Sequence, residues 1–392
     1  MIRVLNVIGN FSLGGIETQV LHMLKTFDRR ELRIDVCHIM PSDGDEGSVD
    51  TTGSSVLRCP RSTNFHDFAQ RFSRLISGGN YDVVHSNFDI WSGPILHGAR
   101  RSGVPVRIAQ IHSLKAEGHR VATTLGKKLG RQILVAWGRT WLLHEATHIL
   151  AVSRAAMEAR WKDWQLYPDR FKIFSLGIDT ARFTPDRSGT NRNGIPTVMC
   201  VGSFLGGPHY PNKRQDLVLR IFRLVLRTVP QARLMFVGKG PHEDSCRRLA
   251  SELGISGSVD FVGVSEDVPR LLNSASVLVL MSELEALPAV LLEGQAAELG
   301  IVASDIPSHR EALAPQYHKY LCPHDSVEKA AENIVVMLSN PELRSKLGAA
   351  GRDYVIQKYD ARRNLRLLEN FYKVCRTKTG ATHETRKAGN HE

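Results

Sequence analysis

Short runs rich in Val and Ile alternate with longer helical patterns along the chain, and this alternation constrains the fold most. Strands buried on both faces of a sheet read as continuous apolar runs, and intervening helices favour parallel pairing. The runs form two series, separated by the polar segment DRSGTNRNGIP at 186–196. The first series comprises 3–8, 33–39, 82–86, 106–112 and 148–153, and the second 197–203, 233–238, 259–263, 276–282 and 300–305.

The polar segment, rich in Gly and Asn, is typical of a linker. Each half restarts a β-α-β pattern, so the sequence predicts an α/β fold of two Rossmann-like domains with parallel sheets. We place them at 1–188 and 189–376, with the option that the last helix packs back on the first domain, and expect a disordered tail at 377–392. Ligands bind beyond the carboxyl ends of such strands, so the cleft between the domains is the expected site.

The cysteine pattern and the apolar runs bear on the compartment. The six cysteines show no CxxC or regular spacing, which argues against a disulfide framework or a zinc site and favours a reducing compartment. The N-terminal residues lack a signal-peptide core, and no apolar run approaches the roughly 20 residues that span a bilayer. We therefore expect a cytoplasmic protein.

The formal net charge of +11 makes an anionic partner plausible: a nucleic acid, a phosphorylated ligand or an anionic membrane. The motifs of common nucleic-acid-binding folds are missing, and we expect no nucleic-acid partner. The excess of positive charge is local, because residues 114–142 hold six basic side chains and one acidic one.

Within 114–142, apolar side chains recur every four residues and predict one stripe along a helix. The stripe and the neighbouring cations are Leu125, Leu129, Ile133, Trp137, Trp141, Lys127, Lys128, Arg131 and Arg139. Such a helix could rest on anionic lipid, with Trp at the interface and cations on headgroups. The alternative is a helix that faces the core.

Two glutamates lie eight residues apart in SELEALPAVLLEGQAAELGIVASD at 282–305. Pro288 suits the first turn of a helix, which places Glu285 in the loop before it and Glu293 inside it. Unpaired N–H groups at the start of a helix bind phosphate. The two carboxylates could accept hydrogen bonds from hydroxyl groups on either side of that phosphate. Phosphate flanked by hydroxyls describes a nucleotide sugar. The alternative is a pair of unrelated surface carboxylates.

This segment resembles the E-x7-E segment of retaining glycosyltransferases with the GT-B fold, the large group 1 family (family 4). Other segments follow in the family's order: GNFSLGGIETQ (9–19), VVHSNF (83–88), VRIAQIHS (106–113), VGKGP (237–241) and FVGVSEDVPRLL (261–272). GGIET together with VPVRIA is most similar to the exopolysaccharide and capsule subset.

The resemblance implies roles for particular residues. Glu285 would hold hydroxyls of the donor sugar, Glu293 the ribose, and His112 would position the sugar. Lys213, with Arg214 beside it, would contact the donor diphosphate. Further contacts to the nucleotide sugar would come from Gly14, Gly15, Gly238, Gly263, Ala286, Leu287 and Pro288.

The implied activity is retaining transfer of a sugar from a nucleotide-diphosphate sugar, with UDP the commonest base, to a glycan acceptor. The acceptor is expected to be lipid-linked and part of a surface polysaccharide, which would bring the protein to the inner face of the plasma membrane. No cofactor or metal is expected, and the acids of DGD at 43–45 are interpreted as a solvated loop.

The sequence departs from the family where an arginine is usual, at Ser203, and where glycine is commoner, at Ala286. These departures support a rival from another class, a non-catalytic nucleotide-sugar-binding or scaffold protein on the same fold. An epimerase or a phosphorylase on this fold is a second rival.

Overall fold

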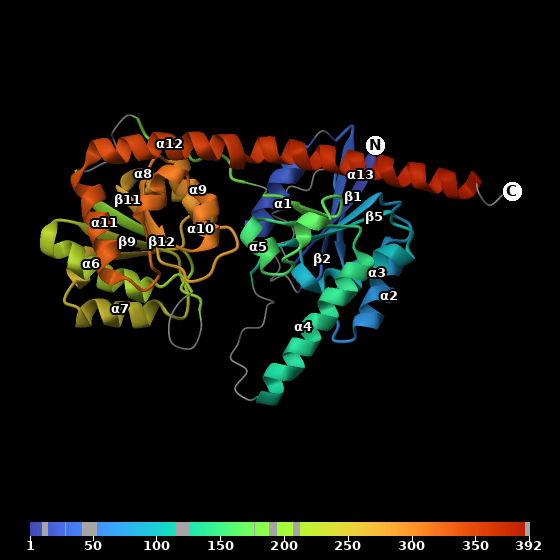
Figure 1. The fold of residues 1–392 in the computed structure, drawn as a ribbon, viewed down its shortest axis with the longest axis horizontal. Coiled ribbons are helices and arrows are strands. Elements are labelled where there is room, and N and C mark those ends of the chain that lie inside the picture. The colour runs from blue at the N-terminus through green and yellow to red at the C-terminus, as the bar shows by residue number, and fades with distance from the viewer. Residues whose placement is uncertain are drawn as a thin grey trace. The chain divides into compact units, whose positions relative to one another are not determined.

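The computed structural model describes residues 1–9, 15–27, 29–40, 53–114, 125–175, 177–187, 194–206 and 212–388. The chain packs as two units, Met1–Leu176 with Arg362–Glu392, and Gly177–Ala361 (Figure 1). The first unit therefore ends before the predicted boundary at 188, and the chain returns to it from Arg362 on. The reason is local: Ile178 bridges to Asp360, so the residues before the linker belong to the second unit.

The first unit is built on a seven-stranded sheet whose described strands all pair in parallel, in the order β3-β2-β1-β4-β5-β6-β7. The strands are β1 (Ile2–Ile8), β2 (Leu32–His38), β3 (Val56–Arg58), β4 (Val83–Ser86), β5 (Val106–Ile111), β6 (His148–Ala151) and β7 (Phe171–Ile173). In the centre, Val4 lies opposite Ile34 and Val83. The five predicted strands are present, and the short edge strands β3 and β7 are additional.

Helices cover this sheet. They are α1 (Gly15–Thr26), α2 (Phe65–Ile76), α3 (Gly93–Arg101), α4 (Leu125–Glu145), α5 (Arg154–Glu158) and α13 (Ala361–Ala388), with short turns η2 (Asp89–Ser92) and η3 (Trp164–Leu166). Side chains of α1 and α13 share one core with β1 and its neighbours (Figure 1). Helix α3 packs between α2 and α4.

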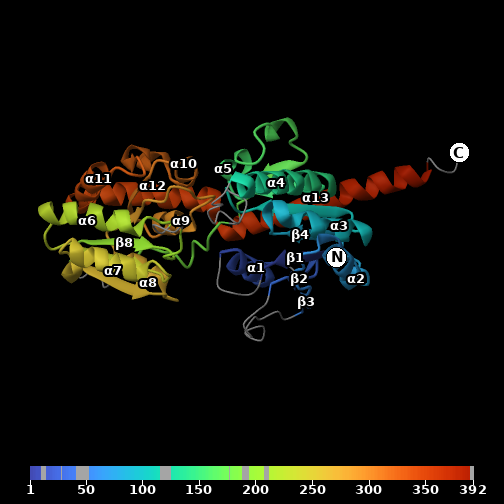
Figure 2. The same cartoon turned by 90° about the horizontal axis from the view of Figure 1, so that it is seen from below.

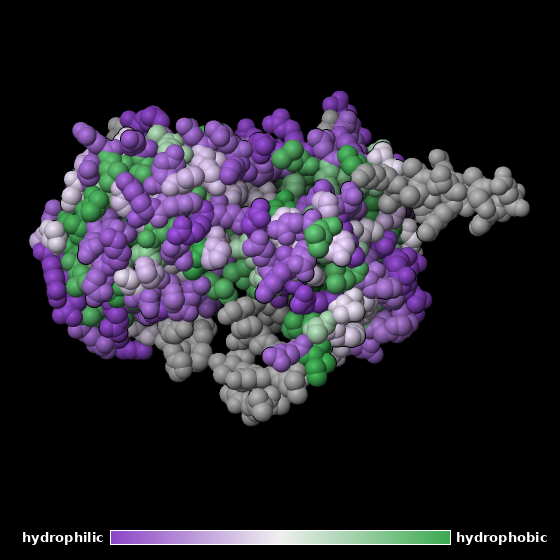
Figure 3. Space-filling view, viewed as in Figure 1, coloured by the Kyte–Doolittle hydropathy of each residue, from purple (hydrophilic) through white to green (hydrophobic). Residues whose placement is uncertain are grey.

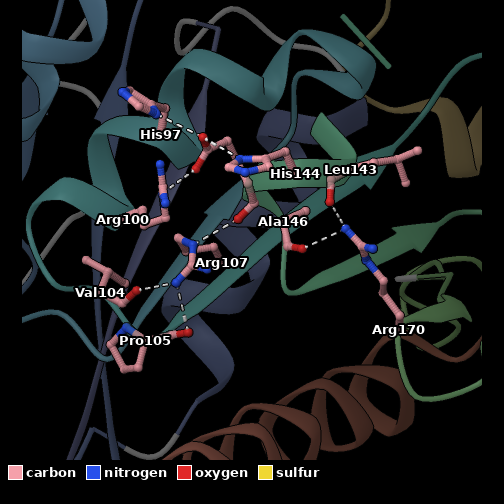
Figure 4. A network of polar contacts seen from close by, with 10 residues as sticks. His97, Arg100, Val104, Pro105, Arg107, Leu143, His144, Ala146 and Arg170 are labelled. Carbon is pink, nitrogen blue, oxygen red and sulfur yellow. Dashed lines mark hydrogen bonds and ion pairs between the residues drawn. The ribbon is translucent and has the colours of Figure 1, made fainter. Parts of the chain in front are cut away.

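Two arginines fix the C-terminal end of α4 (Figure 4). Arg107 of β5 donates to the carbonyl of Glu145 at 2.9 Å, and Arg170 donates to the carbonyl of Ala146 at 3.1 Å. The last carbonyls of a helix lack partners within it, so these guanidinium groups satisfy them. The buried Glu145 carboxylate accepts from His97 and pairs with Arg100, which ties α4 to α3.

The tail differs from the prediction. Helix α13 continues to Ala388, whereas the sequence predicts disorder from 377. This stretch contains the helix formers Lys, Glu, Arg and Ala and no proline, but also Gly380 and four threonines, which disfavour a helix, so the local sequence does not account for the continuation to Ala388. Residues 389–392 lie outside the described part.

The second unit holds a six-stranded sheet in the order β10-β9-β8-β11-β12-β13, again parallel throughout the described strands. Its strands are β8 (Thr197–Val201), β9 (Arg233–Val237), β10 (Val259–Gly263), β11 (Val277–Leu280), β12 (Gly300–Ser304) and β13 (Leu321–Cys322). The strand order reverses between β8 and β11. In doubly wound sheets this reversal is where ligands bind, beyond the carboxyl ends of the strands.

The helices of the second unit are α6 (Gln215–Thr228), α7 (Glu243–Glu252), α8 (Val268–Ser274), α9 (Ala289–Ala296), α10 (Pro307–Ala312), α11 (Val327–Ser339) and α12 (Pro341–Tyr359), with turns η4 (Ser256–Ser258) and η5 (Pro315–Tyr320). Helix α6 lies beside α7 and α11 (Figure 2). A second hydrophobic core fills this unit on its own.

Candidate functional site

Glycines lie at the carboxyl ends of β8, β9 and β10. Gly238 has a φ of 139°, and a Cβ there would lie 2.3 Å from the carbonyl oxygen of Gly202. Its N–H donates to the carbonyl of Gly263 at 2.8 Å. The predicted residues Gly238 and Gly263 thus lie together at adjacent strand ends, where the backbones approach because no side chain intervenes.

Lys213 and Arg214 lie immediately before α6 and point to different partners. The methylenes of Lys213 lie over Gly202, and its ammonium group pairs with Glu285. Arg214 takes a left-handed φ of 53° at the helix start, and its guanidinium donates to Glu283 at 2.7 Å and to Asp216 at 3.2 Å. Lys213 is therefore next to the E-x7-E segment, while Arg214 is occupied by two carboxylates.

Glu285 lies in the loop after β11, at the strand-order reversal. Its Oε1 accepts from the Ser282 hydroxyl at 2.8 Å and from Lys213. The structure thus brings together two predicted residues that are 72 positions apart in sequence. This part of the site therefore presents the Glu285 side chain and the Lys213 ammonium group side by side.

Helix α9 follows this loop. Pro288 caps it in an extended conformation, with φ −79° and ψ 95°, so it stands one position before the first turn in which the sequence placed it. The reason is the ψ of Pro288, which lies outside the helical range although its φ fits. The start of α9 has no side-chain cap, so the amides that follow Pro288 lack a side-chain acceptor there. Ala286 and Leu287 form the approach to it.

Glu293 lies inside α9 and is partly buried. Burial raises the pKa of its carboxyl to about 7, while the positive charges of Arg182 and Lys213 oppose the rise. Within the described part of the chain, its carboxylate has no hydrogen-bond or ion-pair partner. A buried carboxyl left in this way is ready to accept hydrogen bonds from a ligand.

In the first unit, His112 lies directly after β5, as predicted. Its Nε2 is 2.9 Å from Oδ1 of Asn87, and burial, aided by nearby His85, lowers the pKa of its imidazole to about 3. The ring is therefore neutral near pH 7, which suits hydrogen bonding rather than proton transfer. Gly15 begins α1, and Gly14 lies outside the described residues.

Asp89, which was not among the residues predicted from the sequence, holds the backbone of His112. The Asp89 carboxylate accepts from the N–H of His112 at 2.6 Å and from the Ser113 hydroxyl at 2.9 Å. Burial raises its pKa to about 6, and Asp89 itself takes a positive φ of 48°. A polar residue shortly after a buried strand, in VVHSNFD, was the available signal.

The stripe predicted on α4 is partly exposed rather than turned to the core. Ile133 and Trp137 of the stripe are 63% and 45% exposed, and Leu134, which lies outside the stripe, is 44% exposed. Figure 3 shows hydrophobic residues over this helix. Trp137 also packs against Trp141, with ring centroids 4.8 Å apart. Arg139 differs from the prediction, because its side chain turns to Trp161 of the same unit.

The side chains of Leu125, Lys127, Lys128, Leu129 and Arg131 lie outside the described residues, as do the acids at 43–45. In the part of the chain that the structure describes, no helix is long and apolar enough to cross a bilayer.

Comparison with known proteins identifies both halves of the chain. Residues 13–182 match Glycosyltransferase Family 4, and residues 196–354 match Glycosyl transferases group 1. EpsF of Bacillus subtilis, named as a glycosyltransferase, is 24% identical over 392 residues, which cover 96% of this chain and 97% of that protein. EpsD of the same organism is 30% identical over 201 residues, 49% of this chain and about half of that protein (51%).

A mannosyltransferase of Mycolicibacterium smegmatis, GDP-mannose-dependent and acting on phosphatidylinositol monomannoside, is 28% identical over 81% of this chain and 84% of its own length. Among solved structures, HepE of Anabaena in complex with UDP superimposes with a TM-score of 0.76 at 15% identity, covering 95% of this chain and 100% of that one.

Two parallel doubly wound sheets, each in its own unit, together with the similarity to HepE, show the GT-B fold. The two family matches together cover most of the chain, and it belongs to the group 1 glycosyltransferases.

Proposed function

We propose that this protein transfers a sugar from a nucleotide-diphosphate sugar, with UDP favoured as the base, and retains the anomeric configuration. The observation that carries the proposal is the pairing of Lys213 with Glu285 at the strand-order reversal, close to a Glu293 carboxyl that lacks a described partner. HepE, which has been solved with UDP-glucose, supports a nucleotide sugar as the donor.

Each residue of the second unit would act on one part of the donor. Glu285 would accept hydrogen bonds from sugar hydroxyls, and Glu293 from the ribose. The amides around Leu287 would bind the diphosphate at the start of α9. The ion pair between Lys213 and Glu285 would weaken when the donor binds. The Lys213 ammonium group would then stabilise the negative charge that develops on the departing diphosphate.

In the first unit, His112 would position the sugar as a neutral hydrogen-bonding group, and the Gly14–Gly15 loop would add backbone N–H groups. No obvious general base is needed, because the departing phosphate can itself accept the acceptor's proton. Catalysis would then rest on orientation and electrostatic stabilisation, without a metal or cofactor.

For the acceptor we propose a lipid-linked glycan in surface polysaccharide biosynthesis. The similarity to an enzyme that acts on phosphatidylinositol monomannoside supports a lipid-linked acceptor. The exposed Ile133, Leu134 and Trp137 of α4 support contact with an anionic membrane, which would make the protein peripheral on the inner face.

The rival is a protein on this fold that binds a nucleotide sugar without turning it over. Ser203 in place of the usual arginine is its main support, and Arg214 offers no simple replacement because Glu283 and Asp216 already engage it. The rival predicts donor binding that survives and turnover that is absent.

The test is a thermal-shift titration with UDP-, GDP- and ADP-sugars, using wild type, Glu293→Ala and, as a matched control, Glu252→Ala. Glu252 is an exposed glutamate at the end of α7. A shift of several degrees with one donor class, lost in Glu293→Ala and kept in the control, is expected. No shift with any donor would contradict the proposal.

Binding is then followed by turnover, measured as release of the nucleoside diphosphate in the presence of a membrane extract as the acceptor source. Glu285→Gln should bind the donor and lower turnover by at least about 100-fold, because it removes charge from the sugar contact. Wild-type binding without any turnover would favour the rival.

A further inference from the structure

Three buried polar side chains lie behind Glu285 and join the ends of β11 and β12 to α10. They are Ser282, Ser304 and His309, each 0% exposed. The proposed function gives none of them a role. Their hydrogen bonds form a series that passes through two separate groups of Ser282, its carbonyl and then its hydroxyl, and ends at the Glu285 carboxylate.

The series begins at His309. Its Nδ1 lies 2.9 Å from the carbonyl oxygen of Ser304 and 3.1 Å from the Ser304 hydroxyl oxygen. A carbonyl oxygen can only accept, so Nδ1 carries the proton of the imidazole. The tautomer of His309 is therefore fixed, and the Ser304 hydroxyl is left free to donate elsewhere.

The Ser304 hydroxyl donates to the carbonyl of Ser282 at 2.5 Å, which ties the end of β12 to the end of β11. The Ser282 hydroxyl then donates to Oε1 of Glu285 at 2.8 Å. Lys213 donates to the same oxygen. Two donors on Oε1 fix the plane of the carboxylate, and Oε2 is the oxygen left to meet a ligand.

The far end of the series is a buried atom without a described partner. Nε2 of His309 has none in the part of the chain that the structure covers. Burial lowers the pKa of this histidine to about 4, with the charges of Glu285, Lys213 and Asp305 acting on it as well. The His309 ring stays neutral near pH 7. Its Nδ1 therefore continues to donate to Ser304, and the Ser304 hydroxyl to the Ser282 carbonyl.

We propose that Ser282, Ser304 and His309 are positioning residues that hold Glu285 in one orientation, with Oε2 turned to the donor sugar. This inference rests on the proposed function for the role of Glu285 and extends it to residues that never touch the substrate. The alternative is that the three side chains only fasten α10 to the sheet.

Ser282→Ala distinguishes the positioning role from the purely structural one. It removes the Ser282 hydroxyl, which donates to Glu285, and keeps the Ser282 carbonyl, which accepts from Ser304. We expect kcat to fall about tenfold, with the melting temperature and the UDP affinity unchanged. Ser282→Thr should restore kcat. Ser308→Ala is the matched control, since the Ser308 hydroxyl is equally buried and has no described partner.

A double-variant cycle tests whether Ser282 acts through Glu285. If it does, Ser282→Ala combined with Glu285→Gln is no slower than Glu285→Gln alone. Losses that multiply would overturn the inference, and so would an unchanged kcat in Ser282→Ala.

A crystal structure of Ser282→Ala gives a readout that does not depend on activity. The Glu285 carboxylate should turn or occupy two orientations, while the bond from Ser304 to the Ser282 carbonyl remains. A carboxylate that keeps its orientation would refute the positioning role. Wild-type protein that neither binds nor turns over any donor would instead refute the proposed function. The crystal structure of Ser282→Ala would still show whether these hydrogen bonds orient the Glu285 carboxylate.

Discussion

At the scale of single residues, the two glutamates of the E-x7-E segment lie in different surroundings. Glu285 receives Lys213 and the Ser282 hydroxyl, so its charge is compensated in the unliganded protein. Glu293 is partly buried and has no such partner among the described residues, and burial raises its pKa to about 7. Of the two glutamates, Glu293 is therefore the one whose ionisation a bound ligand would change more.

Nucleotide affinity should consequently depend on pH through Glu293. A ribose hydroxyl donates more strongly to a carboxylate than to a carboxylic acid, and Glu293 ionises as the pH rises through about 7. We expect UDP to bind about tenfold more tightly at pH 8 than at pH 6 in calorimetric titrations. Glu293→Gln should bind weakly at both values, and a wild type without pH dependence would contradict the assignment.

At the scale of elements, the ends of β8 and β9 approach only because Gly238 lacks a Cβ. Gly238→Ala should push the strand ends apart and lower the free energy of unfolding by about 2–3 kcal/mol, in addition to weakening nucleotide binding. Gly257→Ala is the control, since a Cβ there would meet nothing within 4 Å. Urea unfolding measures both, and equal stability of the two variants would refute the close approach.

Helix α4 should contact anionic lipid through its exposed apolar side chains. Ile133→Glu with Leu134→Glu should weaken binding to phosphatidylglycerol vesicles several-fold in a sedimentation assay and leave the melting temperature unchanged. Val336→Glu, at an equally exposed apolar position of α11, should leave vesicle binding as in wild type. Equal binding by all three proteins would rule out α4 as the contact.

The sequence predicted ten strands because their residues form short apolar runs, most of which are buried in the two sheets. The edge strands β3, β7 and β13 were missed, since each has two or three residues and only one neighbour to pair with. For the site, the E-x7-E spacing located Glu285 and Glu293. The pairing with Lys213 was not predictable, because it depends on how two distant strand ends meet.

At the scale of the whole molecule, α13 returns the chain to the first unit. Tyr372 of α13 is fully buried, and its hydroxyl lies 2.7 Å from Nδ1 of His85, a residue that is also buried. This grouping agrees with the option that the last helix packs back on the first domain. The boundary predicted at 188 lies too late, because a polar linker marks a surface segment and not the point where packing changes. The bridge between Ile178 and Asp360 determines that point.

Tyr372→Phe should destabilise the first unit and leave the second unchanged, because it leaves the buried His85 without its partner. The expected cost is about 1–3 kcal/mol. Hydrogen exchange resolved by residue would show faster exchange in β1 and β4 and unchanged exchange in β8 and β11. Val374→Ser is the control, since Val374 is 51% exposed on the same helix. Faster exchange in both units would show that they unfold together.

The two ends of the second unit are hydrogen-bonded to each other. The N–H of Ile178 donates to the carbonyl of Tyr359, and the N–H of Ala361 donates to the carbonyl of Ile178, both at 2.8 Å. Residues 177–361 are therefore encoded by one contiguous stretch of the gene. The chain leaves the first unit and returns to it at neighbouring positions. We expect that such a stretch could be exchanged for that of a relative with a single pair of junctions. Under the proposed function, the donor preference would be transferred with it.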